Sequence, residues 1–299
     1  MNQQDWVVGL RGKMLTEGER KWLSAYPPRG IILFARNIES PEQLKQLIAE
    51  AKALAGEALW VAIDEEGGRV HRISWPPFCQ RPHAAVYGEL FLSGDEAQAK
   101  SLVFDDAYRV GLALAALGFT HDCAPVLDIF HPMGNQIIGQ RAYAGDVRTV
   151  AELACAYMDG LALAGIVAIG KHFPGHGRAD ADSHLALPHV DADAKVVLAE
   201  AQTFVRVMNH GLMHVMSAHV IYDALDPQLA TFSSYWLQTV LRQQFGYQGE
   251  IWSDDLCMKG AGNDIFDAVA KAVRAGCTVP LICEPASVGL LYDRILGRE

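Results

Sequence analysis

The sequence predicts an α/β protein that folds as one (β/α)8 barrel of the TIM type, a single domain spanning residues 1–299. Short apolar runs alternate with longer helical patterns, as in a chain of strand–helix units. The runs are almost continuously apolar, which is typical of parallel strands covered by helices on both faces. A length of 299 residues, without a sharp linker, suits a single α/β barrel.

The apolar runs set the number of strands. They cover residues 6–10, 30–35, 59–64, 119–129, 166–173, 212–220, 250–255 and 278–284. Eight strand–helix units favour a closed barrel, whereas six or fewer would favour an open, doubly wound sheet.

Helix start and stop signals lie between these runs. Ser40 followed by Pro41 predicts an N-cap and the first helical residue. Glycines stand where four helices should end before the next strand, at Gly165, Gly211, Gly246 and Gly276. The predicted helices cover residues 41–55, 95–117, 147–164, 193–210, 234–245, 263–275 and 286–297.

Charge and hydropathy exclude several classes of protein. The chain carries 35 acidic and 25 basic residues, a formal net charge of −10 at pH 7. Lysines and arginines form no cluster, which argues against a nucleic-acid partner. No apolar run reaches the roughly 18 residues that span a bilayer, and the amino terminus lacks the pattern of a secretory signal. We therefore expect a cytoplasmic protein without a membrane partner.

Six cysteines occur in apolar segments and form no C-x-x-C motif. We interpret them as buried, reduced thiols, not as a disulfide framework or a zinc site. They are Cys79, Cys123, Cys155, Cys257, Cys277 and Cys283.

Several predicted strands end in ionisable residues. In a barrel the carboxyl ends of the strands converge on one face, where active sites are built. A simpler alternative is that strand ends are polar because they meet loops. The combination of a lysine, two histidines and several acids favours a functional site. The residues are Asp64, Asp128, Lys171, His172, His219, Asp254 and Glu284.

Two segments carry candidate ligand-binding side chains. Asp64 leaves the third strand and is followed by two acids, two glycines and Arg72. The glycines allow close approach of the backbone to a ligand, and a carboxylate can accept hydrogen bonds from sugar hydroxyl groups. A surface turn held by an Arg–Glu ion pair is the alternative. After the fourth strand, Arg141 can clamp a carbonyl or hydroxyl group of a ligand.

A third segment, K-H-F-P-G-H-G from Lys171, is soon followed by D-S-H at 182–184. Glycine and proline directly after a strand predict a loop that can move over a site. The Asp182 carboxylate can hold one imidazole nitrogen of His184 and stabilise the protonated ring. The other nitrogen is then a candidate general acid. Alternatively, His176 and His184 only stabilise the loop or are solvated.

Two acids, Asp254 and Asp255, end the seventh strand. Burying them costs free energy unless they are solvated or used. Consecutive strand residues point to opposite sides, so one faces the barrel mouth as a candidate nucleophile or stabiliser of an oxocarbenium ion. Asp255 can also cap the following turn.

These motifs, with I-I-G-Q-R at 137–141, resemble the β-N-acetylglucosaminidases (β-hexosaminidases) of glycoside hydrolase family 3. The similarity is greatest to the single-domain bacterial type that recycles cell-wall muropeptides, and it spans about residues 6–283. It implies that Asp254 is the nucleophile, that His184 is the acid/base and that Asp182 tunes His184. It also implies that no metal or other cofactor is needed. The implied N-acetylglucosamine site consists of Asp64, Arg72, Arg141, Lys171 and His172.

The resemblance also implies a substrate. This is N-acetylglucosamine β-1,4-linked to anhydro-N-acetylmuramic acid, with or without peptide, and we expect a monomer to act on it. The sequence departs from the family pattern at Glu65, where a glutamine is usual, and at Gln140, Thr278 and Glu284. The chain also ends earlier than is usual. We therefore expect retained chemistry but an irregular or shortened last unit, with a short or absent final helix.

Several reactions remain open. The family resemblance implies retaining hydrolysis through a covalent glycosyl-enzyme. Phosphorolysis is an alternative, because a neutral histidine would admit phosphate as the acceptor. A zinc-dependent amidohydrolase is disfavoured, since the first strand has no histidine pair. A catalytically inactive sugar-binding barrel is also open, as is a substrate-assisted route in which Asp254 and Asp255 orient the acetamido group.

Overall fold

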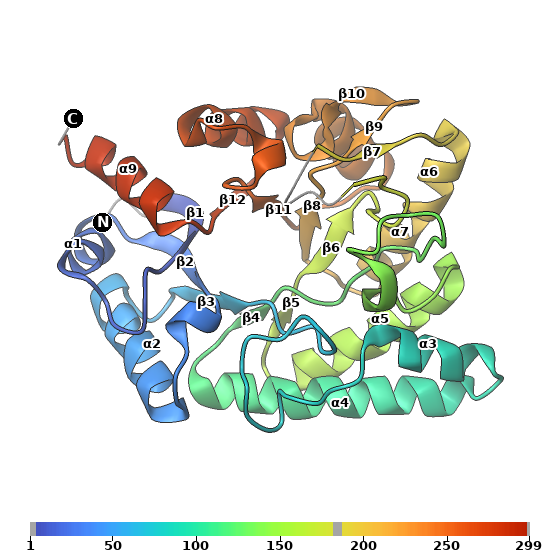
Figure 1. Cartoon of the computed structure of the whole chain (residues 1–299), viewed down its shortest axis with the longest axis horizontal. Helices are drawn as coiled ribbons and strands as arrows, with labels where there is room; N and C mark the ends of the chain where they lie inside the picture. The colour runs from blue at the N-terminus through green and yellow to red at the C-terminus, as the bar shows by residue number, and fades with distance from the viewer. Residues whose placement is uncertain (1–3, 182–186, 298–299) are drawn as a thin grey trace.

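The computed structural model describes residues 4–181 and 187–297 and shows a parallel barrel with helices outside it (Figure 1). Each of the eight predicted apolar runs contains a barrel strand, so the predicted (β/α)8 barrel is confirmed. The barrel strands are β1 (Gln4–Gly9), β2 (Pro28–Leu33), β3 (Trp60–Ile63), β4 (His121–Asp122), β5 (Val167–Ala168), β6 (Gly170–Phe173), β8 (His214–Ser217), β11 (Glu250–Asp255) and β12 (Val279–Ile282).

β5 and β6 share one position in the barrel, because only Ile169 separates them. Among the described residues the strand order is β5-β4-β3-β2-β1-β12-β11-β8-β6, with parallel neighbours. The two ends of this order meet. The Leu127 amide donates to the Lys171 carbonyl at 2.6 Å, and the Lys171 amide donates to the Pro125 carbonyl at 3.2 Å. These bonds close the sheet, so all strands present their carboxyl ends on one face.

Helices begin and end largely where the sequence predicts. The Ser40 hydroxyl accepts a hydrogen bond from the Gln43 amide, and Pro41 is the first residue of α2. Gly276 follows α8 with φ 112°, a left-handed conformation that glycine adopts without strain. No helix within residues 4–181 and 187–297 is long and apolar enough to cross a bilayer. The α-helices are α1 (Glu17–Ala25), α2 (Pro41–Ala55), α3 (Ala84–Leu92), α4 (Glu96–Leu117), α5 (Val147–Leu163), α6 (Ala194–Glu200), α7 (Gln202–Asn209), α8 (Ile265–Ala275) and α9 (Pro285–Ile295).

Some helical segments differ from the prediction. α1 and α3 were not predicted, although Thr16 and Glu19 form a capping box at the start of α1. The predicted helix at 193–210 is divided at Ala201 into α6 and α7. The predicted helix at 234–245 is a π-helix, η4 (Tyr235–Gln244). The short 3-10 turns are η1 (Ala35–Asn37), η2 (Gly139–Arg141), η3 (Ala230–Phe232) and η5 (Lys259–Ala261).

The last strand–helix unit contains both β12 and α9. The helix has 11 residues, as many as α8. Tyr292 of α9 stacks on Trp22 of α1, with ring centroids 4.5 Å apart, and its hydroxyl accepts a hydrogen bond from the Trp6 indole at 3.2 Å. This aromatic packing holds α9 against β1 and α1, so the final helix is present.

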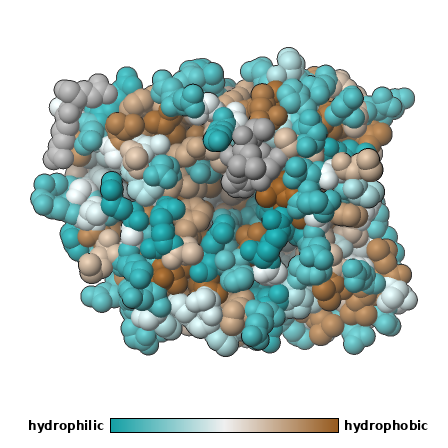
Figure 2. Space-filling view, in the orientation of Figure 1, coloured by the Kyte–Doolittle hydropathy of each residue, from teal (hydrophilic) through white to brown (hydrophobic). Residues whose placement is uncertain are grey.

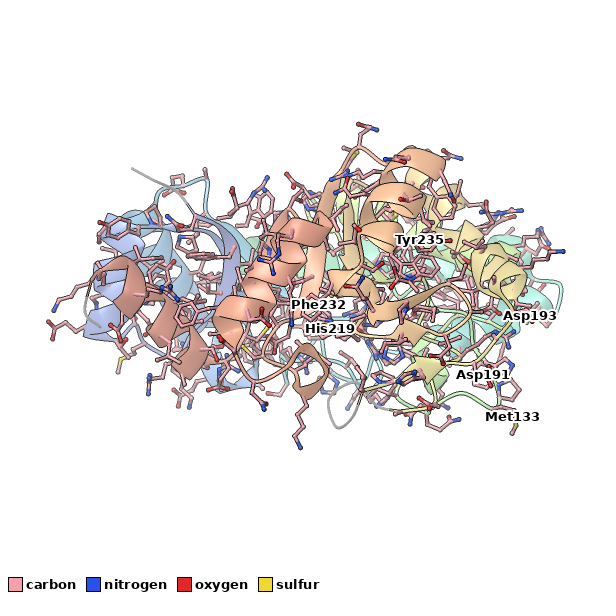
Figure 3. The ribbon with its side chains drawn as sticks, turned by 90° about the horizontal axis from the view of Figure 1, so that it is seen from above. Met133, Asp191, Asp193, His219, Phe232 and Tyr235 are labelled. Carbon is pink, nitrogen blue, oxygen red and sulfur yellow. The ribbon has the colours of Figure 1, made fainter. Side chains whose placement is uncertain are left out.

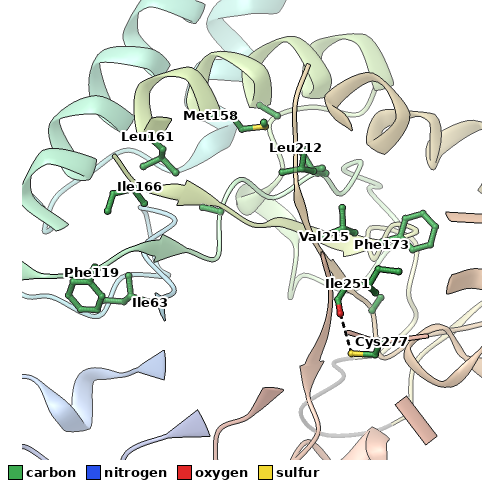
Figure 4. Close-up of a cluster of buried hydrophobic side chains, with 14 of the residues drawn as sticks. Ile63, Phe119, Met158, Leu161, Ile166, Phe173, Leu212, Val215, Ile251 and Cys277 are labelled. Carbon is green, nitrogen blue, oxygen red and sulfur yellow. Dashed lines mark hydrogen bonds between the residues drawn. The ribbon is translucent and has the colours of Figure 1, made fainter. Parts of the chain in front are cut away.

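Apolar side chains fill the barrel and the layer between strands and helices. Inside the barrel they include Ile32, Met216 and Trp252. Figure 4 shows part of the outer layer, where the Cys277 thiol donates to the Ile251 carbonyl at 3.2 Å. The six cysteines are free thiols, as predicted. The burial prediction is correct for Cys123, Cys277 and Cys283 but wrong for Cys79, Cys155 and Cys257, which are partly exposed.

The amino-terminal end of the barrel is closed by aromatic rings. Trp60, Trp252, His121 and His214 lie within 4.6–6.1 Å of one another, measured between ring centroids. Arg29 lies 4.2 Å over the Trp60 ring. Burial lowers the pKa of His121 to about 3 and that of His214 to about 4, so both rings are neutral near pH 7. This plug leaves the opposite end of the barrel for ligands.

A small second sheet lies beside the carboxyl-terminal end of the barrel. It consists of β7 (His189–Val190), β9 (Ile221–Tyr222) and β10 (Asp226–Leu229). The Tyr222 hydroxyl donates to the Gly175 carbonyl at 2.8 Å. This bond fixes the start of the loop that follows β6, next to the candidate site.

Candidate active site

A cavity of about 630 Å³ opens at the carboxyl ends of the barrel strands. Segments that follow β2, β3, β4, β6, β11 and β12 line it, and Figure 2 shows hydrophilic side chains gathered around the centre of this face. Six of the eight predicted site residues line the cavity: Asp64, Arg72, Arg141, Lys171, His172 and Asp254. The other two, Asp182 and His184, lie outside the described residues.

Lys171 forms the centre of an ion-pair network in the cavity floor. Its Nζ lies 2.7 Å from Asp64 Oδ1 and 2.6 Å from Glu66 Oε1. Asp64 also pairs with Arg72 at 3.1 Å. Arg141 binds both carboxylate oxygens of Glu66, at 2.7 and 2.8 Å. Three cations and two carboxylates from three distant segments therefore share one charge network.

Burial and neighbouring charges set the ionisation of this network. Burial alone would raise the pKa of Asp64, but Lys171 and Arg72 outweigh it and hold that pKa far below the ordinary value. For Glu66 burial is likewise outweighed, by Arg141 and Lys171, and its pKa falls to about 2. Burial disfavours the Lys171 ammonium, yet Asp64 and Glu66 raise its pKa above the ordinary value. All members are thus charged at neutral pH.

Asp128 orients His172 of β6 and His176, which follows this strand. One oxygen lies 2.7 Å from His172 Nδ1, and the other accepts hydrogen bonds from the His176 amide at 2.7 Å and the His172 amide at 3.2 Å. Despite burial, these contacts lower the pKa of Asp128 to about 2. With Nδ1 held, the His172 ring is fixed in orientation, and the residue lines the cavity. Burial lowers the pKa of His176 to about 4.

Asp254 and Asp255 divide their roles at the end of β11. One oxygen of the Asp254 carboxylate accepts a hydrogen bond from the Asp255 amide at 2.8 Å. Asp255 Oδ1 accepts hydrogen bonds from the amides of Cys257 at 3.0 Å and Cys283 at 2.9 Å. Asp255 thus caps the turn after β11, as the sequence predicts, and it also connects β11 to β12. Burial raises its pKa.

Two other strand-end residues lie differently. His219 is buried beside Phe232 (Figure 3), where its Nδ1 contacts Thr231 and its Nε2 lies 2.9 Å from the Asp255 carbonyl. It supports the β11 turn and does not line the cavity. Glu284 is exposed at the cavity rim.

Sequence reasoning missed two parts of the site. The sequence marks Glu66 only as part of an acidic turn, yet its carboxylate bridges Lys171 and Arg141. Asp128 was noted as a strand end, but its partners lie 44 and 48 residues away and could not be read from the chain. The sequence does contain one signal for Glu66. Side chains two residues apart in an extended segment point to the same side, so Glu66 is expected on the same side as Asp64.

The arrangement suits a polar ligand rich in hydroxyl groups. Fixed carboxylates can accept hydroxyl protons, and the lysine and arginines can donate to ligand oxygens. Asp254 adds a carboxylate held by a rigid strand end. Across residues 4–181 and 187–297 no three histidine, cysteine, aspartate or glutamate side chains are grouped to hold a metal.

Comparison with known proteins gives one consistent family. The model of the glycosyl hydrolase family 3 N-terminal domain matches residues 5–297. A β-hexosaminidase of Thioalkalivibrio sulfidiphilus is 42% identical over 292 residues, which is 97% of this chain and 83% of the relative. A β-hexosaminidase of Haemophilus influenzae is 36% identical, covering 93% of this chain and 78% of the relative.

Solved structures show the same fold. The structure of NagZ from Neisseria gonorrhoeae in complex with N-trifluoroacetyl-D-glucosamine superposes with a TM-score of 0.91 at 36% identity. That comparison covers 98% of this chain and 86% of the other. A family 3 β-N-acetylglucosaminidase from Paenibacillus has a TM-score of 0.85 at 32% identity, covering 98% of this chain and 57% of the other.

Proposed function

This chain belongs to glycosyl hydrolase family 3 and is a β-N-acetylhexosaminidase, and we propose that it is a retaining exo-enzyme of peptidoglycan recycling. Its proposed substrate is a non-reducing terminal N-acetylglucosamine β-1,4-linked to anhydro-N-acetylmuramic acid, with or without peptide, in the cytoplasm. One observation carries the proposal. A single cavity brings Asp254 together with the charged network of Lys171, Asp64 and Arg141.

The network is proposed to hold the sugar. Asp64, ionised and held by Lys171 and Arg72, is suited to accept hydrogen bonds from adjacent sugar hydroxyl groups. Arg141 and the His172 ring complete the polar wall of the cavity. Because each binding group is already fixed by a partner, little side-chain freedom is lost when the sugar binds.

The chemistry is proposed to take two steps. Asp254 attacks the anomeric carbon and forms a covalent ester, while protonated His184 donates its proton to the departing glycosidic oxygen. Neutral His184 then takes a proton from water, whose oxygen attacks the same carbon and releases Asp254 as a carboxylate. Two inversions leave the anomeric configuration unchanged. Asp182 is proposed to stabilise the protonated ring of His184.

The exposed charges at the cavity rim favour an aglycone that carries carboxylates, because Arg69 and Lys259 outnumber Glu284 there. Arg69 and Lys259 line the cavity and are exposed. The Arg69 guanidinium donates to the backbone carbonyls of Gln136 and Ile137. Whereas the cations of the cavity floor are paired, no carboxylate within residues 4–181 and 187–297 forms an ion pair with Arg69 or Lys259. An aglycone that bears carboxylates, as a peptide-bearing muramic acid does, complements them.

The proposed function is tested by following products from N-acetylglucosaminyl-anhydro-N-acetylmuramic acid and from chitobiose by NMR, with and without phosphate and a chelator. We expect hydrolysis that releases the β-anomer first, is indifferent to the chelator and prefers the muramoyl substrate. N-acetylglucosamine-1-phosphate as the product would establish phosphorolysis instead. Binding of N-acetylglucosamine without turnover of either substrate would indicate an inactive sugar-binding barrel.

Replacing His184 with alanine should slow substrates with basic leaving groups by about 10²-fold or more, because those groups need a proton to depart. Substrates with acidic leaving groups, such as 2,4-dinitrophenol, should lose much less in the first step. The measurement is a plot of kcat/KM against leaving-group pKa for the parent and His184→Ala. Equal losses across the series would contradict the role of His184 as the acid.

A further inference from the structure

Glu65 lies between the two cavity-lining carboxylates Asp64 and Glu66 but points into the protein. Its side chain is fully buried. Oε2 accepts hydrogen bonds from the amides of Arg72 at 3.0 Å and Ile73 at 3.4 Å. The carboxyl group therefore joins the two ends of the turn that presents Asp64, Glu66 and Arg72 to the cavity.

The charged groups around Glu65 come from several elements, and the nearby arginines bind Asp106. From α4, Asp106 binds Arg81 at 2.9 Å and Arg109 at 3.0 Å, and Arg81 lies 3.9 Å from Glu65 Oε1. From β4, the Asp122 carboxylate accepts a hydrogen bond from the Glu65 amide at 2.9 Å. From α5, the Tyr157 hydroxyl contacts Asp122 and the Glu65 carbonyl, both at 3.4 Å.

Asp106 holds the arginines next to this cluster, and among the described residues the Glu65–Asp122 pair has no such close cation. Three buried carboxyl groups, those of Glu65, Asp106 and Asp122, lie near two guanidinium groups. The buried Arg81 and the exposed Arg109 both bind Asp106. Glu65 Oε1 accepts no hydrogen bond from any described residue. A second buried negative charge without a partner is strongly disfavoured, so one acid of the Glu65–Asp122 pair stays neutral.

We propose that Glu65 is a positioning residue that works in its protonated form, anchoring the turn 64–73 so that Asp64, Glu66 and Arg72 meet the ligand. Ionised Glu65 would place an extra charge beside Asp122 and Asp64. The repulsion between these charges is reduced only if water enters or the turn moves. Movement of the turn separates Arg72 from Asp64. Ligand affinity is then lost while the reacting groups at β11 stay in place. The inference rests on the proposed sugar site but not on turnover.

The pH at which this should occur follows from the direction of the shift. Burial, together with the Asp122 carboxylate, raises the pKa of Glu65 from 4.5 to about 8. Burial raises the pKa of Asp122 to about 6. The folded protein thus holds a proton that the unfolded chain has already released between about pH 4.5 and 8. Stability from this proton is present below pH 4.5 and is lost as the pH rises to 8.

The test compares the parent with Glu65→Gln, which keeps the shape of the side chain and cannot ionise. N-acetylglucosamine binding is measured by calorimetry from pH 6 to 9.5, and Tm over the same range. The parent Kd should rise about tenfold by pH 9, because only the protonated fraction binds. Glu65→Gln should keep its affinity across this range. The Tm of the variant should increase relative to that of the parent as the pH rises towards 8.

Kinetics provide a second readout. With the 2,4-dinitrophenyl glycoside, which needs no acid in its first step, the parent KM should rise above pH 8 while kcat changes little. Glu57→Gln, a change at an exposed carboxylate, serves as the matched control and should follow the parent. If Glu65→Gln does not fold, Asp122→Asn replaces it, and the Kd transition should move to lower pH because a neighbouring charge is gone.

Identical pH profiles of Kd and Tm in the parent and Glu65→Gln would overturn the proposal. Failure of the proposed function looks different. If the protein shows no turnover but its Kd for N-acetylglucosamine depends on pH, the proposed reaction is wrong and the proposed role of Glu65 stands. No binding of the sugar at any pH would remove the sugar site itself.

Discussion

Replacing Asp254 with asparagine is expected to reduce kcat for 4-nitrophenyl β-N-acetylglucosaminide by roughly 10⁴-fold or more, the scale on which enzymes lose turnover with their nucleophile. The amide keeps the size of the side chain and can still accept the hydrogen bond from the Asp255 amide. It cannot form the glycosyl ester. Asp255 is a poor substitute, since two backbone amides hold its Oδ1 and burial raises its pKa.

The decisive measurements are steady-state kinetics, sugar binding and Tm for the parent, Asp254→Asn and Asp254→Ala. Both variants should bind N-acetylglucosamine and unfold near the parent Tm. A 5-fluoro glycosyl fluoride should label the parent on Asp254, as peptide mass spectrometry would show. Turnover that survives in Asp254→Asn, with no covalent label on the parent, would move the reaction to a substrate-assisted route. A label on another residue would instead identify a different nucleophile.

Replacing Lys171 with methionine is expected to produce the largest loss of site integrity. The ammonium is 3% exposed and separates two carboxylates, 2.7 Å from Asp64 and 2.6 Å from Glu66. Without it these buried charges face each other, and removal of one partner of a buried ion pair costs about 3–5 kcal/mol. The affinity for N-acetylglucosamine should fall about 10- to 100-fold as well, because Asp64 loses the charge that holds it.

Lys271→Met is the matched control for this prediction. Lys271 forms one exposed ion pair with Asp267 on α8, at 2.6 Å, and such pairs contribute about 0–1 kcal/mol. Urea unfolding of the parent and both variants gives the free energy of unfolding, and calorimetry gives the affinity. Equal, small losses in Lys171→Met and Lys271→Met would show that water replaces the ammonium and that the network is not essential to the site.

Strand periodicity made most of the fold predictable. Each apolar run contains a barrel strand because a strand buried on both faces must be apolar along its whole length, a signal that local sequence carries. Ser40 and Gly276 marked a helix start and a helix end for similarly local reasons. α1 and α3 were missed because they are short and occupy segments that the strand–helix pattern left unassigned.

The site was predictable to the extent that its residues stand at strand ends. Asp64, Lys171 and Asp254 were identified from that position, and the structure places all three in the cavity. The partnerships among them were not predictable. Glu66 and Arg141 are separated by 75 residues, and nothing in either segment specifies the other. The roles of Asp182 and His184 stay predictions, because both residues lie outside the described part of the chain.

By itself, the sequence determined the eight strand positions of the barrel, their parallel arrangement and the face on which the acids and bases gather. These properties follow from hydrophobic periodicity and from the rule that strand ends in a barrel converge. The charge states were decided only by the tertiary structure. Glu65 and Glu66 are adjacent and chemically identical. Burial beside Asp122 raises the pKa of Glu65, whereas Arg141 and Lys171 outweigh burial and lower the pKa of Glu66. Ionisation depends on burial and on charges a few ångströms away, and the closed barrel brings those charges from distant parts of the chain.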